Sequence, residues 1–240
     1  MRKYQKGPHP FVLEPPQSKR KVYSEGENLH FHMILLGRAV EYLPLIIRSF
    51  LLLGNYGIGQ KNGKYRLEIV RTGKEKIYQA GQENINKFST EKLCITPNGI
   101  DVKSASQSEI DINFITQTHI IYREKSSDHP EFHMVIRNLL RRISLISYFH
   151  CGGLRLPWDF KIIIKEAEKI KIKSSNLIWK NTERYSYRQQ KEIPISGVTG
   201  AVKYQGNIPP FLSLLKAGEL LHIGKGTSMG LGKIKIKVLN

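Results

Sequence analysis

A glycine-rich segment near the C-terminus constrains the fold more than any other part of the chain. Residues 222–238 read HIGKGTSMGLGKIKIKV, so four glycines surround Lys225 and an alternating strand follows. Glycine adopts positive φ angles and permits close backbone approach, and successive amides in such a loop can form an anion-binding concavity. The segment predicts either a phosphate-contacting loop or a tight helix-to-strand turn, and the local sequence favours neither.

The glycine spacing differs from that of two common phosphate-binding motifs. A P-loop requires G-x-x-x-x-G-K-[ST], but Thr227 stands where its first glycine would be, and Ile234 follows Lys233. The dinucleotide fingerprint G-x-G-x-x-G would need a glycine at Met229 and a following helix. Neither nucleotide cofactor class is therefore expected.

Basic residues outnumber acidic ones along the chain. There are 38 Lys and Arg against 20 Asp and Glu, a formal net charge of +18. Such an excess favours a polyanionic partner, with nucleic acid first and an anionic membrane surface second. A generally basic proteome would give the same composition, so both explanations stay open.

The cysteine count and the apolar runs exclude several classes. Cys94 and Cys151 are far apart, which argues against a disulfide framework and a thiolate zinc site. No His, Asp or Glu spacing suggests a metal, and no cofactor is expected. The first ten residues are polar and proline-rich, unlike a signal peptide, and no apolar run approaches the roughly 18 residues of a membrane span. We expect a cytoplasmic protein.

Both ends of the chain show the pattern strand, helix, glycine loop and strand. The two predicted helices begin at Pro44 and at Pro209, and proline suits the first turn of a helix. An offset of 167 residues aligns three glycines in the two loops, which indicates a duplicated unit. The aligned pairs are Gly57 with Gly224, Gly59 with Gly226, and Gly63 with Gly230.

The middle of the chain supplies the rest of the second copy. Residues 109–123 alternate as a strand, and residues 132–149 carry apolar side chains at helical spacing. With the later elements they give the ferredoxin-like order β-α-β-β-α-β. We predict an α+β protein with tandem ferredoxin-like domains at residues 1–107 and 108–240. The first domain, with strands at 11–13 and 29–36, lacks an opening strand–helix pair.

Several short motifs match one known family. In chain order they are PFVLEPP at 10–16, LLGRA at 35–39, GNYGIG at 54–59, RYSYRQ at 184–189 and the terminal glycine loop. Over nearly its whole length the chain resembles the RAMP superfamily of CRISPR-associated proteins, specifically its repeat-processing endoribonuclease family. The resemblance implies paired ferredoxin-like domains and a glycine loop that contacts RNA.

The same resemblance implies a reaction. Such enzymes cut the precursor CRISPR transcript within each repeat without a metal ion. The ribose 2′-hydroxyl attacks the adjacent phosphate and leaves a 2′,3′-cyclic phosphate, which requires a base, an acid and a cation. The expected partners are CRISPR repeat RNA and other CRISPR-associated subunits, with no membrane.

The chain departs from this family at its start. Relatives usually carry a strand–helix unit ahead of the PFVLEPP segment, and the catalytic histidine of many relatives lies there. This chain starts almost at that segment, so no residue is assigned as catalytic by motif. We expect that the missing strand–helix unit belongs to a second polypeptide or to an upstream segment, or else that the catalytic activity has been lost.

Three histidines are candidates for proton transfer, since the imidazole pKa lies near neutrality. His30 and His32 alternate on one face of a predicted strand, where they would act as base and acid or stand as ordinary polar residues. His150 ends a predicted helix, where a cation suits the helix dipole, so a structural role is its alternative.

The candidate RNA contacts lie in two segments. Arg184 and Arg188 share one face of a predicted strand, and arginine pairs with phosphate and stacks on bases. An exposed basic strand is the alternative. In the terminal segment, His222 is equally suited to capping the helix. The terminal candidates are His222, Gly224, Lys225, Gly226, Gly230, Gly232 and Lys233.

Three hypotheses follow for the function. The first is a CRISPR RNA-binding protein of the repeat-processing family that cleaves precursor CRISPR RNA within repeats. The second is a non-catalytic RAMP subunit that holds guide RNA in an effector complex. The third is a basic structural protein of an unrelated ribonucleoprotein.

Overall fold

The structure is a computed structural model that describes residues 7–16, 20, 22–59, 61–87, 107–153, 155–186 and 189–239. The chain divides into two compact units, residues 1–34 with 95–240 and residues 35–94. This division differs from the predicted boundary between residues 107 and 108. The reason is that strand β1 (Phe11–Glu14) packs against the C-terminal glycine loop.

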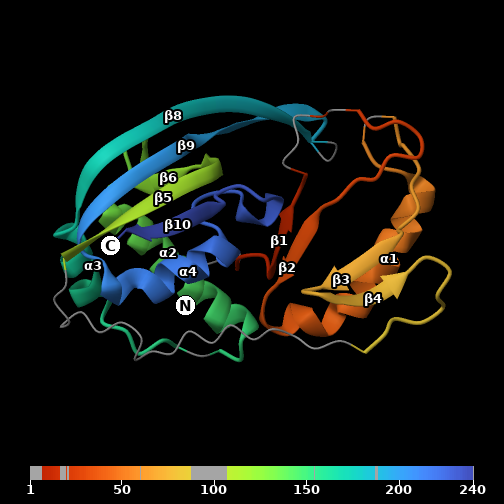
Figure 1. The fold of residues 1–240 in the computed structure, drawn as a ribbon, viewed down its shortest axis with the longest axis horizontal. Coiled ribbons are helices and arrows are strands. Elements are labelled where there is room, and N and C mark those ends of the chain that lie inside the picture. The colour runs from red at the N-terminus through yellow and green to blue at the C-terminus, as the bar shows by residue number, and fades with distance from the viewer. Residues whose placement is uncertain are drawn as a thin grey trace. The chain divides into compact units, whose positions relative to one another are not determined.

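The larger unit is built on a four-stranded antiparallel sheet with the strand order β10-β5-β9-β8 (Figure 1). Helices α2 and α4 lie together on one face of this sheet (Figure 1). The chain order β5, α2, β8, β9, α4, β10 is the predicted ferredoxin-like arrangement. The bounds are β5 (Gln107–Thr118), α2 (Phe132–His150), β8 (Lys171–Ser186), β9 (Lys191–Asn207), α4 (Leu212–Leu221) and β10 (Ile234–Leu239).

The predicted apolar patterns form the core of this unit. On β5, the alternating residues Ile110, Ile112 and Phe114 are all buried. On α2, residues three or four apart face them, and Val135 and Leu139 are fully buried. A strand places alternate side chains on one face and a helix does so every 3.6 residues, so the two patterns meet in one layer.

A tyrosine hydroxyl is satisfied inside this core. Tyr204 is fully buried on β9, and its hydroxyl donates to the Pro130 carbonyl at 2.6 Å. Its ring meets Phe132 edge-on at 5.2 Å. Burial raises the pKa of Tyr204 far above its usual value, so the phenol stays a donor.

The segment from Lys161 to Lys173 is divided between a helix and a strand. Helix α3 (Phe160–Glu168) begins after Asp159, whose carboxylate accepts hydrogen bonds from two amides of the first turn. Such an N-cap satisfies helix amides that have no partner within the helix. Strand β8 then begins at Lys171.

Strands β8 and β9 form a hairpin that extends past the rest of the sheet. Pairing of β5 with β9 ends at Thr118 and Val198, whereas β8 and β9 stay paired to Ser186 and Lys191. The chain after β5 instead forms a small hairpin of β6 (Ile120–Tyr122) and β7 (Lys125–Ser127).

The described part of the smaller unit contains a 3-10 helix, an α-helix and a β-hairpin. The 3-10 helix η1 (Gly37–Tyr42) leads into α1 (Leu43–Tyr56), and β3 (Ile69–Thr72) pairs with β4 (Glu75–Gln79). Ile47, Ile77 and Tyr78 form its core. The strand predicted at 29–36 is β2 (His32–Leu35), which pairs with β1. Residues 72–107 are polar and are predicted from the sequence to form a hairpin or linker between the two domains; of these, residues 88–106 lie outside the described residues.

The two glycine loops have similar backbone angles, but their helix ends align at a different offset from their glycines. The C-cap of α1 is Gly57, with φ 85° and ψ 168°, and the C-cap of α4 is His222, with φ 58° and ψ 164°. These two positions are 165 residues apart, whereas the glycines with matching φ angles are 167 apart: Gly57 (85°) with Gly224 (81°), and Gly59 (76°) with Gly226 (73°). The first loop closes between Ile58 and Gly63, and the second closes between residues 223 and 232, so the second is longer.

Removing the buried Tyr204 hydroxyl is expected to destabilise the larger unit. Tyr204→Phe leaves the Pro130 carbonyl unpaired, and we expect the free energy of unfolding to fall by about 1–2 kcal/mol. Urea unfolding followed by tryptophan fluorescence measures this. The control Tyr185→Phe removes an exposed hydroxyl bonded to Gln190 and should change stability by less than about 0.5 kcal/mol. Equal effects would contradict the role of Tyr204.

Candidate nucleic-acid interface

The loop between α4 and β10 is held by backbone hydrogen bonds. The Ile223 amide donates to the Gly232 carbonyl at 2.9 Å and closes the loop. The Lys225 amide donates to the His119 carbonyl, and the Gly232 amide to the Gln117 carbonyl, each at 3.1 Å. Because these amides are bonded within the protein, they do not supply the anion-binding concavity considered from the sequence.

Two of the loop glycines are required by packing. Gly232 has φ 74°, and a Cβ there would lie 1.7 Å from the Ile223 carbonyl oxygen. Gly224 has φ 81°, and its Cβ would lie 2.5 Å from the His119 carbonyl oxygen. Only glycine fits such positions. Packing therefore accounts for both glycines, and any contact with a ligand would come from side chains of the loop.

A threonine of β5 and a short 3-10 helix complete the loop. The Thr116 hydroxyl donates to the Gly230 carbonyl and accepts from the Lys233 amide, both at 2.9 Å. Helix η4 (Thr227–Met229) forms the turn.

Lys225, the only charged residue between residues 223 and 232, has an exposed side chain. The loop thus presents the exposed side chain of Lys225 on a hydrogen-bonded backbone.

His119 lies beside Lys225 in a polar and aromatic setting. Its Nε2 is 2.7 Å from Ser126 Oγ, its Nδ1 is 3.3 Å from Ser196 Oγ, and its ring meets Trp179 edge-on at 5.7 Å. Burial and the nearby charge of Lys225 lower the pKa of His119, so its neutral form is favoured. No sequence motif marks His119, because its surroundings are formed by tertiary contacts.

A buried cluster of charged groups underlies the loop. Glu14, on β1, is 7% exposed. Its Oε1 lies 2.8 Å from Nε2 of His222, and its Oε2 lies 2.7 Å from Nζ of Lys233. On the other side of the ring, Nδ1 of His222 lies 3.0 Å from the Leu231 carbonyl oxygen. A carbonyl only accepts hydrogen bonds, so Nδ1 carries a hydrogen.

This cluster changes the roles expected for two candidates. His222 is fully buried, so it holds the loop and does not contact phosphate directly. The Lys233 ammonium is engaged by Glu14, and its side chain is 30% exposed. Burial alone would raise the pKa of the Glu14 carboxyl, but hydrogen bonds with Lys233 and His222 outweigh it, and the pKa is lowered. Glu14 is therefore an anion at neutral pH.

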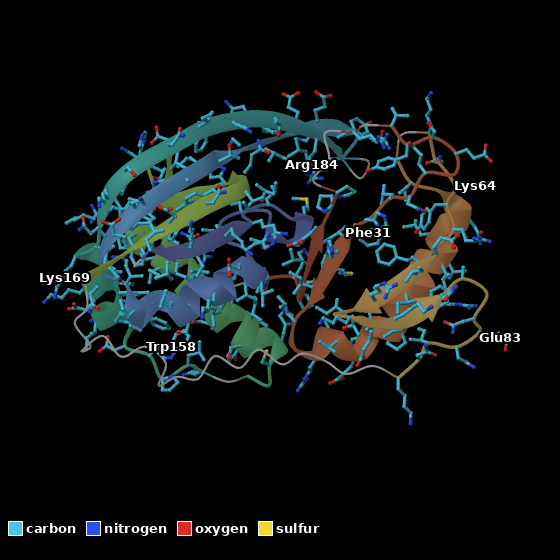
Figure 2. The ribbon with its side chains drawn as sticks, viewed as in Figure 1. Phe31, Lys64, Glu83, Trp158, Lys169 and Arg184 are labelled. Carbon is cyan, nitrogen blue, oxygen red and sulfur yellow. The ribbon has the colours of Figure 1, made fainter. Side chains whose placement is uncertain are left out.

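The extended hairpin carries Arg184. Figure 2 shows Arg184 toward the far end of β8, with Lys169 just before the opposite end. Two residues earlier, the hydroxyl of Thr182 accepts a hydrogen bond from Gln117 Nε2 at 3.0 Å, and the backbone of Gln117 binds the glycine loop. This contact joins the hairpin to the loop. Arg188 lies outside the described residues, so its role stays a prediction.

The three predicted catalytic histidines have different surroundings. His30 and His32 are exposed, and His32 is the first residue of β2. His150 is the last residue of α2, and its Nε2 donates to the Pro8 carbonyl at 2.7 Å. That bond gives His150 a structural contact with the N-terminal segment. A catalytic role for these histidines stays a prediction.

Two further findings concern metal sites and membranes. Within the described residues, no group of three or more His, Cys, Asp or Glu side chains is placed to hold a metal ion. No helix in the described part of the chain is long and apolar enough to cross a membrane.

The fold and loop define an α+β protein of the ferredoxin-like class, and comparison with known families identifies it further. The model of the CRISPR-associated endoribonuclease Cas6 family matches residues 112–234, and that of the AF_1859_N N-terminal domain matches residues 1–90. The first match spans more than half of the chain, so the chain belongs to the Cas6 family. This confirms the resemblance seen in the sequence. No protein with a curated description matches the chain.

Solved structures share the fold at low sequence identity. A product complex of Thermus thermophilus Cas6 (TTHB231) is 16% identical, with TM-score 0.56, over 95% of this chain and 82% of that one. A Cas6 (TTHA0078) product complex is 19% identical, with TM-score 0.52, over 97% and 84%. A partial Cas6-RT-Cas1–Cas2 complex is 15% identical, with TM-score 0.57, over 95% and 39%.

A side chain at Gly232 is expected to disrupt the loop. Gly232→Ala would place Cβ against the Ile223 carbonyl, and we expect it to lower the free energy of unfolding by more than about 2 kcal/mol. The control Gly26→Ala has a similar φ of 81° and open space around Cβ, so it should cost about 1 kcal/mol from backbone conformation alone. Urea unfolding compares them, and equal losses would contradict the packing requirement.

Proposed function

We propose that this chain cleaves precursor CRISPR RNA within its repeats by a metal-independent attack of the ribose 2′-hydroxyl on the adjacent phosphate. Membership of the Cas6 endoribonuclease family supports the substrate class. The observation that carries the proposal is the backbone contact between Lys225 and His119, which places an exposed cation beside a proton acceptor.

These two side chains suit the steps of the reaction. The 2′-hydroxyl must lose its proton, and neutral His119 can accept one. Negative charge then develops on the phosphoryl oxygens, where Lys225 would stabilise it. The departing 5′-oxygen takes a proton and leaves as a hydroxyl, while the other fragment ends in a 2′,3′-cyclic phosphate. His30, His32 and His150 remain the other candidates for proton transfer.

The hydroxyls around His119 support such a role. Ser126 and Ser196 can each donate or accept a hydrogen bond, so they orient the ring in either protonation state. The Trp179 ring makes an edge-on contact with the His119 ring. A base held in this way keeps its direction when it gains or loses a proton.

A second candidate function is a non-catalytic subunit that holds CRISPR RNA among other CRISPR-associated proteins. One observation favours it. The loop glycines and the buried His222 serve packing, so none of them supplies a group for proton transfer, and the loop would only bind RNA. The structural relative named as a partial Cas6-RT-Cas1–Cas2 complex supports such partners.

A cleavage assay separates the two functions. The purified chain is incubated with labelled repeat RNA from its own CRISPR array in EDTA. We expect cutting at one position within the repeat, with a cyclic phosphate at the new 3′ end. His119→Ala should slow cutting at least 100-fold, since general base catalysis contributes about that much, while RNA binding changes less than twofold.

Single alanine variants of His30, His32 and His150 serve as the matched set in that assay. Binding without cutting at several protein concentrations would overturn the enzyme proposal and leave the subunit. Full activity of His119→Ala, with loss in another variant, would move the proton-transfer role to that residue.

The phosphate contact of Lys225 predicts a change in salt dependence. Lys225→Ala should weaken binding of repeat RNA and of oligouridine alike, because phosphate contacts carry no sequence information. The slope of log affinity against log salt should fall by about 0.7 for one lost contact with a single strand. Lys216→Ala, an exposed lysine on α4, is the control. An unchanged slope for Lys225→Ala would contradict the contact.

A further inference from the structure

We propose that Glu14 is the positioning residue of the RNA-binding loop. The inference rests on the proposed role of that loop in holding RNA. Glu14 is almost fully buried and lies in the sequence more than 200 residues before the loop. Its two carboxylate oxygens bind His222, where the loop begins, and Lys233, where the loop ends. One side chain of β1 thus holds both ends of the loop.

The backbone of His222 supports this assignment. Its φ of 58° combined with ψ of 164° lies close to a backbone region that is essentially restricted to glycine. The matching position in the smaller unit is Gly57, with φ 85° and a nearly equal ψ. A glycine is therefore sufficient for the turn itself. At position 222 the side chain is retained despite its backbone strain, and its bonds to Glu14 and Leu231 hold it there.

The length of the second loop explains why it needs such a clamp. The shorter loop closes with two backbone hydrogen bonds between Ile58 and Gly63, each 2.9 Å long. The longer loop closes with the Ile223 amide on the Gly232 carbonyl. Closing a longer loop costs more conformational entropy. The bonds from His222 to Leu231 and from Glu14 to Lys233 add side-chain support across the wider opening.

Direct packing of β1 on the loop completes the clamp. A Cβ at Gly230 would lie 2.8 Å from the Leu13 carbonyl oxygen and 2.7 Å from Pro15 Cδ. The residues on both sides of Glu14 therefore touch the loop backbone. Since Glu14 itself is shielded from solvent, its effect on RNA must pass through the loop that carries Lys225.

The first test measures the loop without RNA. In Glu14→Ala, we expect the amides of Lys225 and Gly232 to exchange hydrogen for deuterium at least tenfold faster, while amides of β5 and β9 stay protected. His222→Gly is the second variant, because glycine suits the backbone there and the variant should fold. It should show the same local increase. Glu25→Ala removes an exposed carboxylate of the same unit and should change neither region.

The second test asks whether Glu14 acts through Lys225. We expect Glu14→Ala to weaken oligouridine binding about fivefold in the native chain and less than twofold in the Lys225→Ala background. A purely structural effect would multiply with the loss caused by Lys225→Ala, and that result would overturn the proposal. Glu25→Ala controls for the gain in net positive charge.

The two tests fail in different ways. Unchanged loop exchange in both Glu14→Ala and His222→Gly would overturn the clamp, whatever the loop binds. If Lys225→Ala leaves RNA affinity unchanged, the proposed RNA contact of Lys225 is overturned. If Glu14→Ala leaves RNA affinity unchanged, the role of Glu14 in RNA binding is overturned.

Discussion

The close approach of the glycine loop to the end of β5 is the contact on which the candidate site depends. The loop amides of Lys225 and Gly232 bind the carbonyls of His119 and Gln117. A side chain at Gly224 would collide with the same backbone. This contact holds the backbone of Lys225 next to that of His119, the residue that directly follows β5. The glycines that packing requires therefore also keep the backbones of these two residues in contact.

In the larger unit, exposed cations are free to meet a polyanion, whereas the charged groups beneath the glycine loop are paired with one another. The chain has a formal net charge of +18, and exposed cations such as Lys225 are available to a polyanion. Beneath the loop, Glu14 compensates Lys233 and binds His222. Removing one partner of a buried ionic cluster is far more damaging than its net contribution suggests, because the other partner stays buried and unpaired. The cluster thus makes the N-terminal strand necessary for a loop at the other end of the chain.

The sequence predicted those features that depend on local pattern. The alternation of Ile110 and Ile112 gave β5, and the ferredoxin-like order was correct because each element has its own period. The offset of 167 residues was wrong at the helix ends, since glycine spacing aligned loops of unequal length. His119 and Glu14 were missed because their roles arise from contacts with residues more than 70 and 200 positions away. The sequence contains eight histidines that could transfer a proton, and only the tertiary contacts show that His119 lies next to Lys225.

The packing role of the glycines does not argue against a role in RNA binding. A phosphate contact requires a cation at a defined place, and a flexible loop would lose conformational entropy when it bound. Bonds from Thr116 and Glu14 remove much of that freedom in advance. By the same reasoning, rigidity alone does not make a nuclease, because cutting also needs a proton acceptor near the phosphate. Among the described residues, His119 is placed to serve as one, since its backbone binds Lys225 and its ring lies between two hydroxyls.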